Sequence, residues 1–256
     1  QVAEEESLFY KINFRLGRLY EVMQENKNSI TKEQSDLQEL ISDISHQVKT
    51  PIANLKIINS TLMEQDVPAQ KQKEFLAAQA GQLDKLDFLM QAMIKTSRLE
   101  AGVISLEKKE QPIYYTLAAA LGGILLGAEK KQIDVQVDCP EHLEACHDRK
   151  WTGEALFNIL DNAVKYTPTG GQIHVQVEAW EMYLKIDIAD TGIGIPEQHQ
   201  GTIFKRFYRE DAVHDVEGIG IGLYLAREII SLQGGYIRVA SEVGKGSVFS
   251  VFLLRK

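Results

Sequence analysis

Apolar residues recur at helical spacing through the first part of the chain. From Ile30 they fall at Leu37, Ile41, Ile44 and Val48, at intervals of seven, four, three and four that predict one seam along a long helix. A similar stripe precedes this seam, and a second seam follows a break at 65–68; their members are Ile12, Leu16, Leu19 and Met23, then Leu76, Leu83, Leu86, Met90 and Met93. The pattern predicts a helical hairpin that ends near the glycine at 102. Because two narrow seams cannot close a core alone, we expect two copies to pair as a four-helix bundle.

Beyond the hairpin the pattern changes to short alternating strands. Segments 133–137, 173–177 and 184–188 alternate apolar and polar residues between helical stretches, which predicts a separate α/β domain. The charged segment 99–111 is typical of a polar linker between the two parts. The longest apolar stretch, 114–128, falls short of the roughly 18 residues of a membrane span, so we expect a buried helix there.

Composition narrows the class of protein. The 256 residues are 44% hydrophobic and 25% charged, which is typical of a soluble globular protein, and the net charge of -8 argues against a nucleic-acid binder. Cys139 and Cys146 follow no metal-ligand or disulfide-rich spacing, so we interpret them as ordinary thiols in a reducing compartment. The opening at Gln1 resembles neither a signal peptide nor a natural start, so any membrane segment is expected upstream.

A first polar cluster lies on a predicted helix. Asn158, Asn162 and Lys165 are four and three residues apart and therefore share one helix face. Amide oxygens ligate Mg²⁺ and an ammonium group holds phosphate, so the face carries the groups that a metal-triphosphate needs. Alone, such a stripe is more often a solvated helix face.

A second cluster, Asp190-Thr-Gly192-Ile-Gly194-Ile195, directly follows the predicted strand at 184–188. Glycines let the backbone approach a ligand closely, and a carboxylate at a strand end can accept hydrogen bonds from an adenine amino group. An ordinary glycine turn explains the same residues about equally well.

A third cluster contains Gly218, Gly220, Gly222 and Leu223 and precedes a helical run at 224–232. Glycines that lead into a helix present backbone N–H groups and the positive end of the helix dipole to phosphates. The spacing differs from Gly-x-Gly-x-x-Gly, and the chain has no Gly-x-x-x-x-Gly-Lys-Ser/Thr, so neither a dinucleotide fold nor a P-loop is expected.

Taken in order, segments 158–166, 190–195, 203–209 and 220–223 resemble the N, G1, F and G2 boxes of histidine kinase ATP-binding domains, and 244–247 resembles the glycine turn near the end of that domain. The resemblance implies a Bergerat α/β sandwich that binds ATP beneath a mobile lid at about 198–220. The implied nucleotide-binding set is Asn158, Asn162, Lys165, Tyr166, Asp190, Gly192, Gly194, Ile195, Phe204, Arg206, Phe207, Arg209, Gly218, Gly220, Gly222 and Leu223.

The same resemblance assigns roles within this set. Asn162 is the Mg²⁺ ligand with Asn158 in support, Lys165 and Tyr166 contact the nucleotide, and Asp190 reads adenine. The resemblance also implies that one of the two lid arginines, at 206 or at 209, reaches the γ-phosphate, and it does not distinguish between them.

A candidate phosphoacceptor lies in the helical hairpin. His46 is about 200° round the helix from Ile44 and so faces solvent. Segment 45–51 resembles the H-box of the dimerisation and phosphotransfer domain, which makes His46 the residue that is phosphorylated. Members of that family mostly have Glu or Asp after the histidine, whereas this chain has Gln47, which cannot take up a proton at pH 7. We therefore expect slower autophosphorylation than in a Gln47→Glu variant.

Two neighbours of the candidate histidine carry further expectations. Thr50 lies one turn after it, where related kinases hold a residue for dephosphorylating the partner, and an ordinary helical threonine is an equally weighted alternative. Pro51 removes a backbone donor and is expected to bend the helix just past the histidine.

As a whole, the resemblance implies a sensor histidine kinase with a signalling helix at 1–30, a phosphotransfer hairpin at 31–103 and a catalytic ATP-binding domain at 104–256. Such a protein is a homodimer that uses ATP and Mg²⁺, passes phosphate to an aspartate of a response regulator receiver domain, and forms the cytoplasmic portion of a membrane sensor. Two other readings remain: a degenerate, ATP-binding scaffold, for which Gln47 is the sign, and an ATPase machine of the same nucleotide fold.

Overall fold

The computed structural model describes residues 2–64, 67–100, 102, 104–210 and 218–255. Its contacts divide the chain into two compact units, 1–84 and 85–256.

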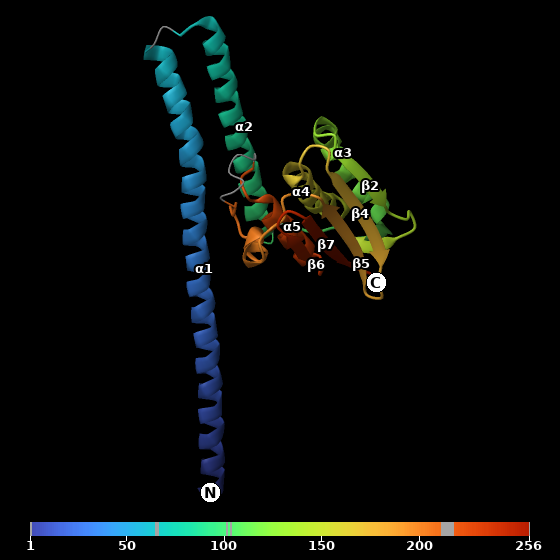
Figure 1. Cartoon of the computed structure of the whole chain (residues 1–256). Helices are drawn as coiled ribbons and strands as arrows, with labels where there is room; N and C mark the ends of the chain where they lie inside the picture. Colours follow the sequence, from blue (N-terminus) through green and yellow to red (C-terminus); the bar gives the residue numbers. More distant parts are fainter. Residues whose placement is uncertain (1, 65–66, 101, 103, 211–217, 256) are drawn as a thin grey trace. The chain divides into compact units, whose positions relative to one another are not determined.

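The first unit contains one long helix and the first half of a second helix, whose other half belongs to the second unit. Helix α1 (Val2–Glu64) continues without interruption through Pro51, and α2 (Ala69–Glu100) starts after the connection, so the predicted helical hairpin is confirmed (Figure 1). At the start of α2 the Gln72 side chain donates to the Val67 carbonyl at 2.9 Å, which fixes the entry of the chain into the helix. Of the predicted break at 65–68, residues 67–68 are not helical, and 65–66 lie outside the described residues.

The second unit contains a five-stranded sheet in the order β2-β4-β5-β7-β6. Its strands are β2 (Asp134–Asp138), β4 (Gln172–Ala179), β5 (Tyr183–Asp190), β6 (Tyr236–Glu242) and β7 (Gly246–Leu254). β2 runs parallel to β4, and the other neighbours are antiparallel. The three strands expected from alternation are β2, β4 and β5, so those predictions are confirmed.

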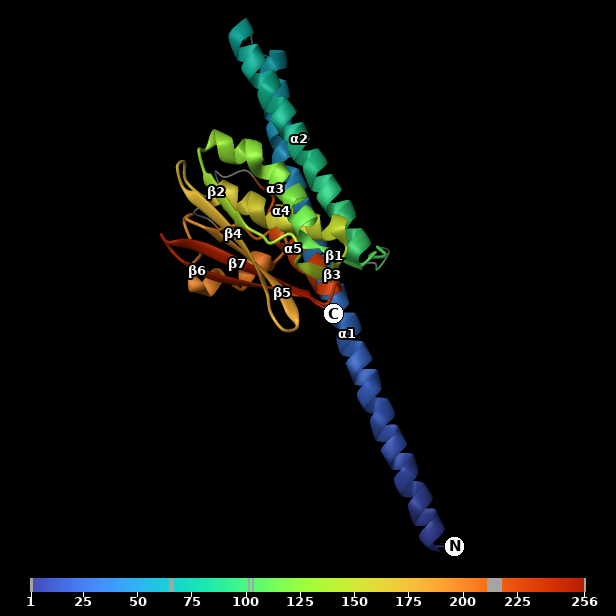
Figure 2. The ribbon, with the colours of Figure 1, turned by 90° about the vertical axis from the view of Figure 1, so that its right-hand side faces the viewer.

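Three helices cover one face of this sheet: α3 (Ile113–Lys130), α4 (Arg149–Tyr166) and α5 (Gly222–Leu232) (Figures 1 and 2). Alternate residues of the central strands, such as Val175, Ile186 and Val251, are fully buried, and α4 contributes a buried stripe that includes Ile159. The apolar residues that alternate along the strands and those at helical spacing on α4 are thus buried in one core, and the predicted α/β sandwich is confirmed.

On the opposite face of the sheet aromatic side chains gather at the ends of the strands. Phe252 stacks on Tyr236 with ring centroids 4.3 Å apart, and Trp180 and Tyr183 approach Phe252 edge-on. These rings cover sheet surface that the helices leave uncovered.

Two expectations about the segments before this sheet were wrong in part. Within the expected linker, β1 (Lys109–Pro112) pairs antiparallel with β3 (Glu144–His147), and Leu99 belongs to α2 and is buried. The expected buried helix is α3, but only one of its faces is buried, and Leu126 is 74% exposed. In the part of the chain that the structure describes, no helix has the length and apolar character needed to cross a bilayer.

Candidate functional site

A cavity of about 590 Å³ lies in the second unit. Its wall is formed by one face of α4, the loop after β5, the segment after η2 (Thr202–Phe204) and the turn that begins α5. The lining includes Lys131, Asn158, Asp161, Asn162, Lys165, Tyr166, Asp190, Gly194, Ile195, Tyr208, Arg209, Glu210, Gly218, Gly220, Gly222, Leu223, Ser247 and Phe249. Three segments that the sequence singled out separately therefore meet at one cavity.

Helix α4 supplies the polar wall. Asp148 caps its N-terminus, because its Oδ1 accepts hydrogen bonds from the backbone N–H groups of Lys150 and Trp151, each at 3.0 Å. Farther along, the Asn158 amide donates to the Glu154 carbonyl at 2.9 Å. Its amide oxygen is thereby turned toward Gly222, where an added Cβ would lie 3.0 Å from it.

The cation of this wall is held by an acid on the same helix. Lys165 Nζ lies 2.6 Å from Asp161 Oδ2, one turn back, and both side chains line the cavity with Asn162 between them in sequence. Two amide groups, a carboxylate and an ammonium group are thus placed on one helix face.

The carboxylate expected to read a base closes the next wall. Asp190 is the last residue of β5, and its Oδ1 accepts the Gly192 N–H at 2.8 Å. Burial raises the pKa of Asp190 above its ordinary value of 3.8, while hydrogen bonds from the backbone N–H groups of Gly192 and Ser247 act in the opposite direction. A carboxylate that is partly removed from water, with remaining acceptor capacity, suits recognition of an amino group.

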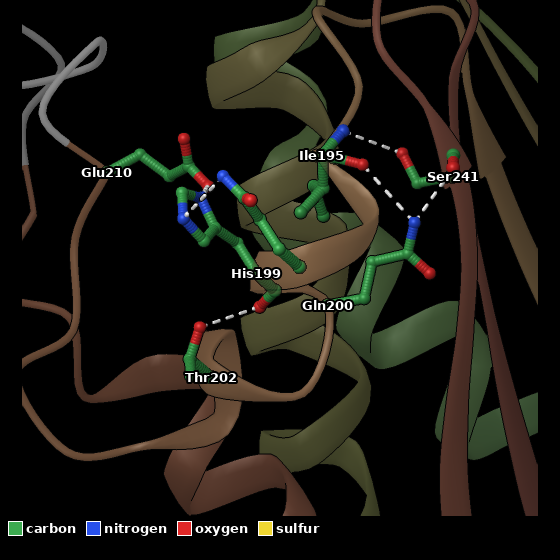
Figure 3. A network of polar contacts seen from close by, with 7 residues as sticks. Ile195, His199, Gln200, Thr202, Glu210 and Ser241 are labelled. Atoms are coloured by element: carbon green, nitrogen blue, oxygen red, sulfur yellow. Dashed lines mark hydrogen bonds and ion pairs between the residues drawn. The ribbon is translucent and has the colours of Figure 1, made fainter.

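The loop that follows is pinned to the β6–β7 hairpin (Figure 3). The Ile195 N–H donates to Ser241 Oγ at 2.8 Å, and the Gln200 amide donates to the carbonyls of Ile195 and Ser241 at 3.2 and 2.8 Å. Gly194 has φ of 72°, and a Cβ there would lie 2.1 Å from the Glu242 carbonyl oxygen. Only glycine fits this close approach, so the loop shape is set by the hairpin beside it.

The predicted lid is described up to residue 210 and again from 218; its segment 211–217 lies outside the described residues. His199, at the end of η1 (Glu197–His199), pairs with Glu210 at 2.5 Å and accepts the Thr202 hydroxyl on its carbonyl (Figure 3). Arg209 lines the cavity and donates to the Gly218 carbonyl at 2.9 Å.

Helix α5 begins at the cavity. The first-turn N–H groups of a helix have no partner within the helix, and no side-chain cap was found at this start among the described residues. Gly220 before it has φ of 79°, and its Cβ would lie 2.6 Å from the Tyr208 carbonyl oxygen. Glycine at this position lets the backbone at Tyr208, in the predicted lid, lie close to the N-terminus of α5, which can bind an anion.

Most residues proposed from the sequence line the cavity, and four do not. Gly192 packs its backbone between Asp190 and the Tyr166 carbonyl, and Phe204 is buried against Phe249. The Arg206 guanidinium lies over the Tyr224 ring at 4.8 Å and donates to its hydroxyl at 2.9 Å. The fourth residue is Phe207, whose φ of 57° marks a tight turn.

Sequence reasoning missed other lining residues, among them Lys131, Asp161, Glu210 and Ser247. Three of the four lie within segments that the sequence singled out, at 158–166, 198–220 and 244–247, but they were not assigned to the site. Lys131 lies outside all of these segments and reaches the cavity through the tertiary fold.

The candidate phosphoacceptor lies in the first unit. His46 is exposed on α1, as its position opposite Ile44 predicted, and the flanking Gln47 and Val48 are half-buried. The Thr50 hydroxyl lies 3.4 Å from the His46 carbonyl oxygen, one turn back, and is itself exposed. The imidazole is thus accessible on the helix surface.

Comparison with known families matches both parts of the chain. Residues 36–102 match the His Kinase A (phospho-acceptor) domain, and residues 147–256 match the histidine kinase-, DNA gyrase B- and HSP90-like ATPase family. The first match contains His46, and the second contains most of the residues that line the cavity, including those of α4, of the loop after β5 and of the start of α5.

Curated relatives match over both parts together. The chain is 31% identical over 225 residues to drug sensory protein A of Synechocystis sp., covering 82% of this chain and 34% of the relative. It is 31% identical over 224 residues to the sensor protein SrrB of Staphylococcus aureus, covering 84% of this chain and 37% of the relative. The chain therefore spans about a third of the length of these relatives.

Solved structures share the fold. The Acinetobacter baumannii histidine kinase AdeS aligns with a TM-score of 0.67 at 19% identity, over 82% of this chain and 98% of that one. Histidine kinase ThkA, solved in complex with the response regulator TrrA, aligns with a TM-score of 0.70 at 22% identity, over 88% and 64%. With both domain matches in order along the chain, the protein belongs to the sensor histidine kinase family.

Proposed function

We propose that this chain is an ATP-dependent protein histidine kinase that phosphorylates His46 and passes the phosphoryl group to an aspartate of a response regulator. One observation carries the proposal: a single chain holds an exposed histidine within a phospho-acceptor domain and a polar cavity within an ATPase-family domain. Neither half alone would suffice, since a kinase of this kind needs both a nucleotide site and a nucleophile.

Each wall of the cavity has a task in nucleotide binding. Asp190 accepts a hydrogen bond from the adenine amino group, while the N-terminus of α5 and Lys165 bind the phosphates. The oxygen donors of Asn162 and Asn158 fit a hard divalent cation, which prefers such ligands. When bound there, Mg²⁺ would neutralise charge on the phosphates.

Of the two lid arginines, Arg209 is proposed as the one that reaches the γ-phosphate. It lines the cavity, whereas Arg206 lies on the ring of Tyr224 outside the lining. A guanidinium aimed at the transferring group stabilises the charge that develops there.

The chemistry at the histidine is a displacement at phosphorus. A neutral imidazole nitrogen of His46 forms the N–P bond as the bond to the ADP oxygen breaks, and the ring loses its proton to solvent or a neighbouring base. The phosphoramidate product then gives its phosphoryl group to a carboxylate oxygen of the regulator and restores the imidazole. The complex of the related ThkA with its response regulator supports this choice of partner.

A homodimer is part of the proposal. In the single chain, seam residues of the first unit remain open: Ile30 and Ile41 on α1 are each 56% exposed, and Leu76 and Leu83 on α2 are each 57% exposed. Apolar rows of this kind are buried when a second hairpin completes a four-helix bundle. We further propose that the full protein is a membrane sensor whose cytoplasmic portion this chain forms, with attachment through a segment outside it.

Incubation of the whole chain with γ-labelled ATP and Mg²⁺ tests the activity. We expect an acid-labile, alkali-stable label on the protein that disappears in His46→Gln and persists in His142→Gln, which alters another exposed histidine. Nucleotide binding without any label would favour the degenerate scaffold, and released phosphate without protein label would favour an ATPase. Equal labelling of wild type and His46→Gln would refute the proposed phosphoacceptor.

A further inference from the structure

The turn between α3 and β2 holds a lysine in an unusual set of contacts. Lys131 directly follows α3, and Gln132 after it has φ of 52°, which bends the chain sharply. The Lys131 ammonium donates to three backbone carbonyls, of Val164 at 2.9 Å, Lys165 at 2.7 Å and Thr167 at 3.0 Å. All three belong to the C-terminal end of α4.

These contacts complete the hydrogen bonding of that helix end. The last carbonyls of a helix have no partner within it and need one from elsewhere. The Ala163 carbonyl accepts the Thr167 N–H at 3.0 Å, and the Tyr166 carbonyl accepts the Ile193 N–H at 3.3 Å. With the three carbonyls that accept from Lys131, every carbonyl from 163 to 167 has a donor.

The ammonium group has no donor left for a ligand. A lysine carries three N–H donors, and all three are used on α4, although Lys131 lines the cavity. Its positive charge also lies at the negative end of the helix dipole, where a cation stabilises the last turn. Lys131 therefore acts on the cavity through the helix and not as a direct ligand.

The turn that it holds carries two proposed nucleotide contacts, Lys165 and Tyr166, and through the Tyr166 carbonyl it also meets Ile193 of the loop after β5. A second tie comes from the Lys131 carbonyl, which accepts the Gly170 N–H at 2.9 Å. One residue outside every recognised motif thus joins the end of α3 to the end of α4 and to the turn that follows it.

We propose that Lys131 is a positioning residue of the nucleotide site, which sets Lys165 and Tyr166 in their binding geometry by holding the end of α4. The inference rests on the proposed nucleotide binding of the cavity. Loss of the ammonium would leave three carbonyls without their donor, and the last turn would fray, so the two side chains that it carries would lose their fixed position.

The test is a titration of the whole chain with ATP and Mg²⁺. We expect Lys131→Met to bind ATP about tenfold or more weakly, as the loss of charge-assisted hydrogen bonds implies. Lys131→Arg keeps the charge and several donors and should recover most of the affinity. Lys130→Met, at the exposed neighbouring lysine, is the matched control and should bind as wild type does.

A double-mutant cycle separates positioning from general damage to the fold. The effects of Lys131→Met and Lys165→Met on ATP affinity should fall well short of additive, because the first acts through the second, whereas Lys131→Met and Asp190→Asn should be closer to additive. Lys131→Gln serves as a second variant if Lys131→Met does not fold. Failure of both to fold would reject positioning in favour of a purely structural role.

The outcomes also separate this inference from the function on which it rests. If wild type binds no adenine nucleotide, the proposed function fails. If wild type binds and Lys131→Met binds equally well, or Lys131→Arg recovers nothing, only the positioning role fails.

Discussion

Gly194 offers the sharpest test of how the fold shapes the cavity. Its φ of 72° lies in the left-handed region, and an added Cβ would sit 2.1 Å from the Glu242 carbonyl oxygen and 2.9 Å from the Val243 Cα. Gly170 has a similar φ of 79°, but nothing lies within 4 Å of its Cβ position. The two sites share the backbone cost of an alanine and differ in the clash.

The expected magnitudes follow from that difference. Gly170→Ala should lose about 1–2 kcal/mol of unfolding free energy, the cost of a left-handed residue with a side chain. Gly194→Ala carries the same cost plus about 1–3 kcal/mol for overpacking against backbone that cannot rotate away. Relief of the clash requires the loop to leave the β6–β7 hairpin, so ATP affinity should fall in Gly194→Ala and stay unchanged in Gly170→Ala.

Denaturant unfolding followed by tryptophan fluorescence measures the stability term. The two tryptophans of the chain, Trp151 and Trp180, both lie in the second unit, so the signal reports the domain that carries the mutations. Equal destabilisation by the two substitutions, or unchanged ATP affinity in Gly194→Ala, would refute the argument that the hairpin sets the shape of the loop.

Three further predictions concern charge and proton transfer. Burial raises the pKa of Asp190 above its ordinary value of 3.8, so the wild type loses stability as the pH rises from about 4 through the folded-state pKa. Over that pH range Asp190→Asn should gain stability relative to wild type, and it should bind ATP more weakly. A stability difference that does not depend on pH would count against this. Gln47→Glu should speed labelling of His46 at saturating ATP by up to about a hundredfold, and an equal or lower rate would contradict a missing base. Thr50→Ala should slow dephosphorylation of the partner regulator while His46 labelling persists, and unchanged dephosphorylation would end the proposal of a second activity.

Periodic patterns predicted the elements because burial imposes them directly. The alternation at 133–137 became β2 at Asp134–Asp138, and the seam through Ile44 and Val48 became α1. Each of these segments buries one face against a core, and this burial requires apolar residues at a regular spacing within the segment itself.

The missed features depend on partners far away in the chain. Strand β1 consists largely of charged and polar residues and forms because Glu110 lies opposite Cys146, a pairing that its own composition does not indicate. Phe204 belongs to a recognised box, but its side chain packs into the core. A sequence motif gives the order of residues along the chain and does not give the direction in which each side chain points. Lys131 has no pattern around it, and its role appears only where α3 meets the end of α4.

The charges that line the cavity explain how an acidic protein can admit a polyphosphate. Three carboxylates belong to the described lining, and two of them are paired: Asp161 with Lys165 and Glu210 with the His199 ring. The third, Asp190, accepts a backbone N–H from Gly192 instead. Because a carboxylate near a triphosphate repels it unless its charge is compensated, the Asp161–Lys165 ion pair suits the phosphate side. The carboxylate that has backbone donors and spare acceptor capacity suits the base, so the partners of each acid predict the orientation of the nucleotide in the cavity.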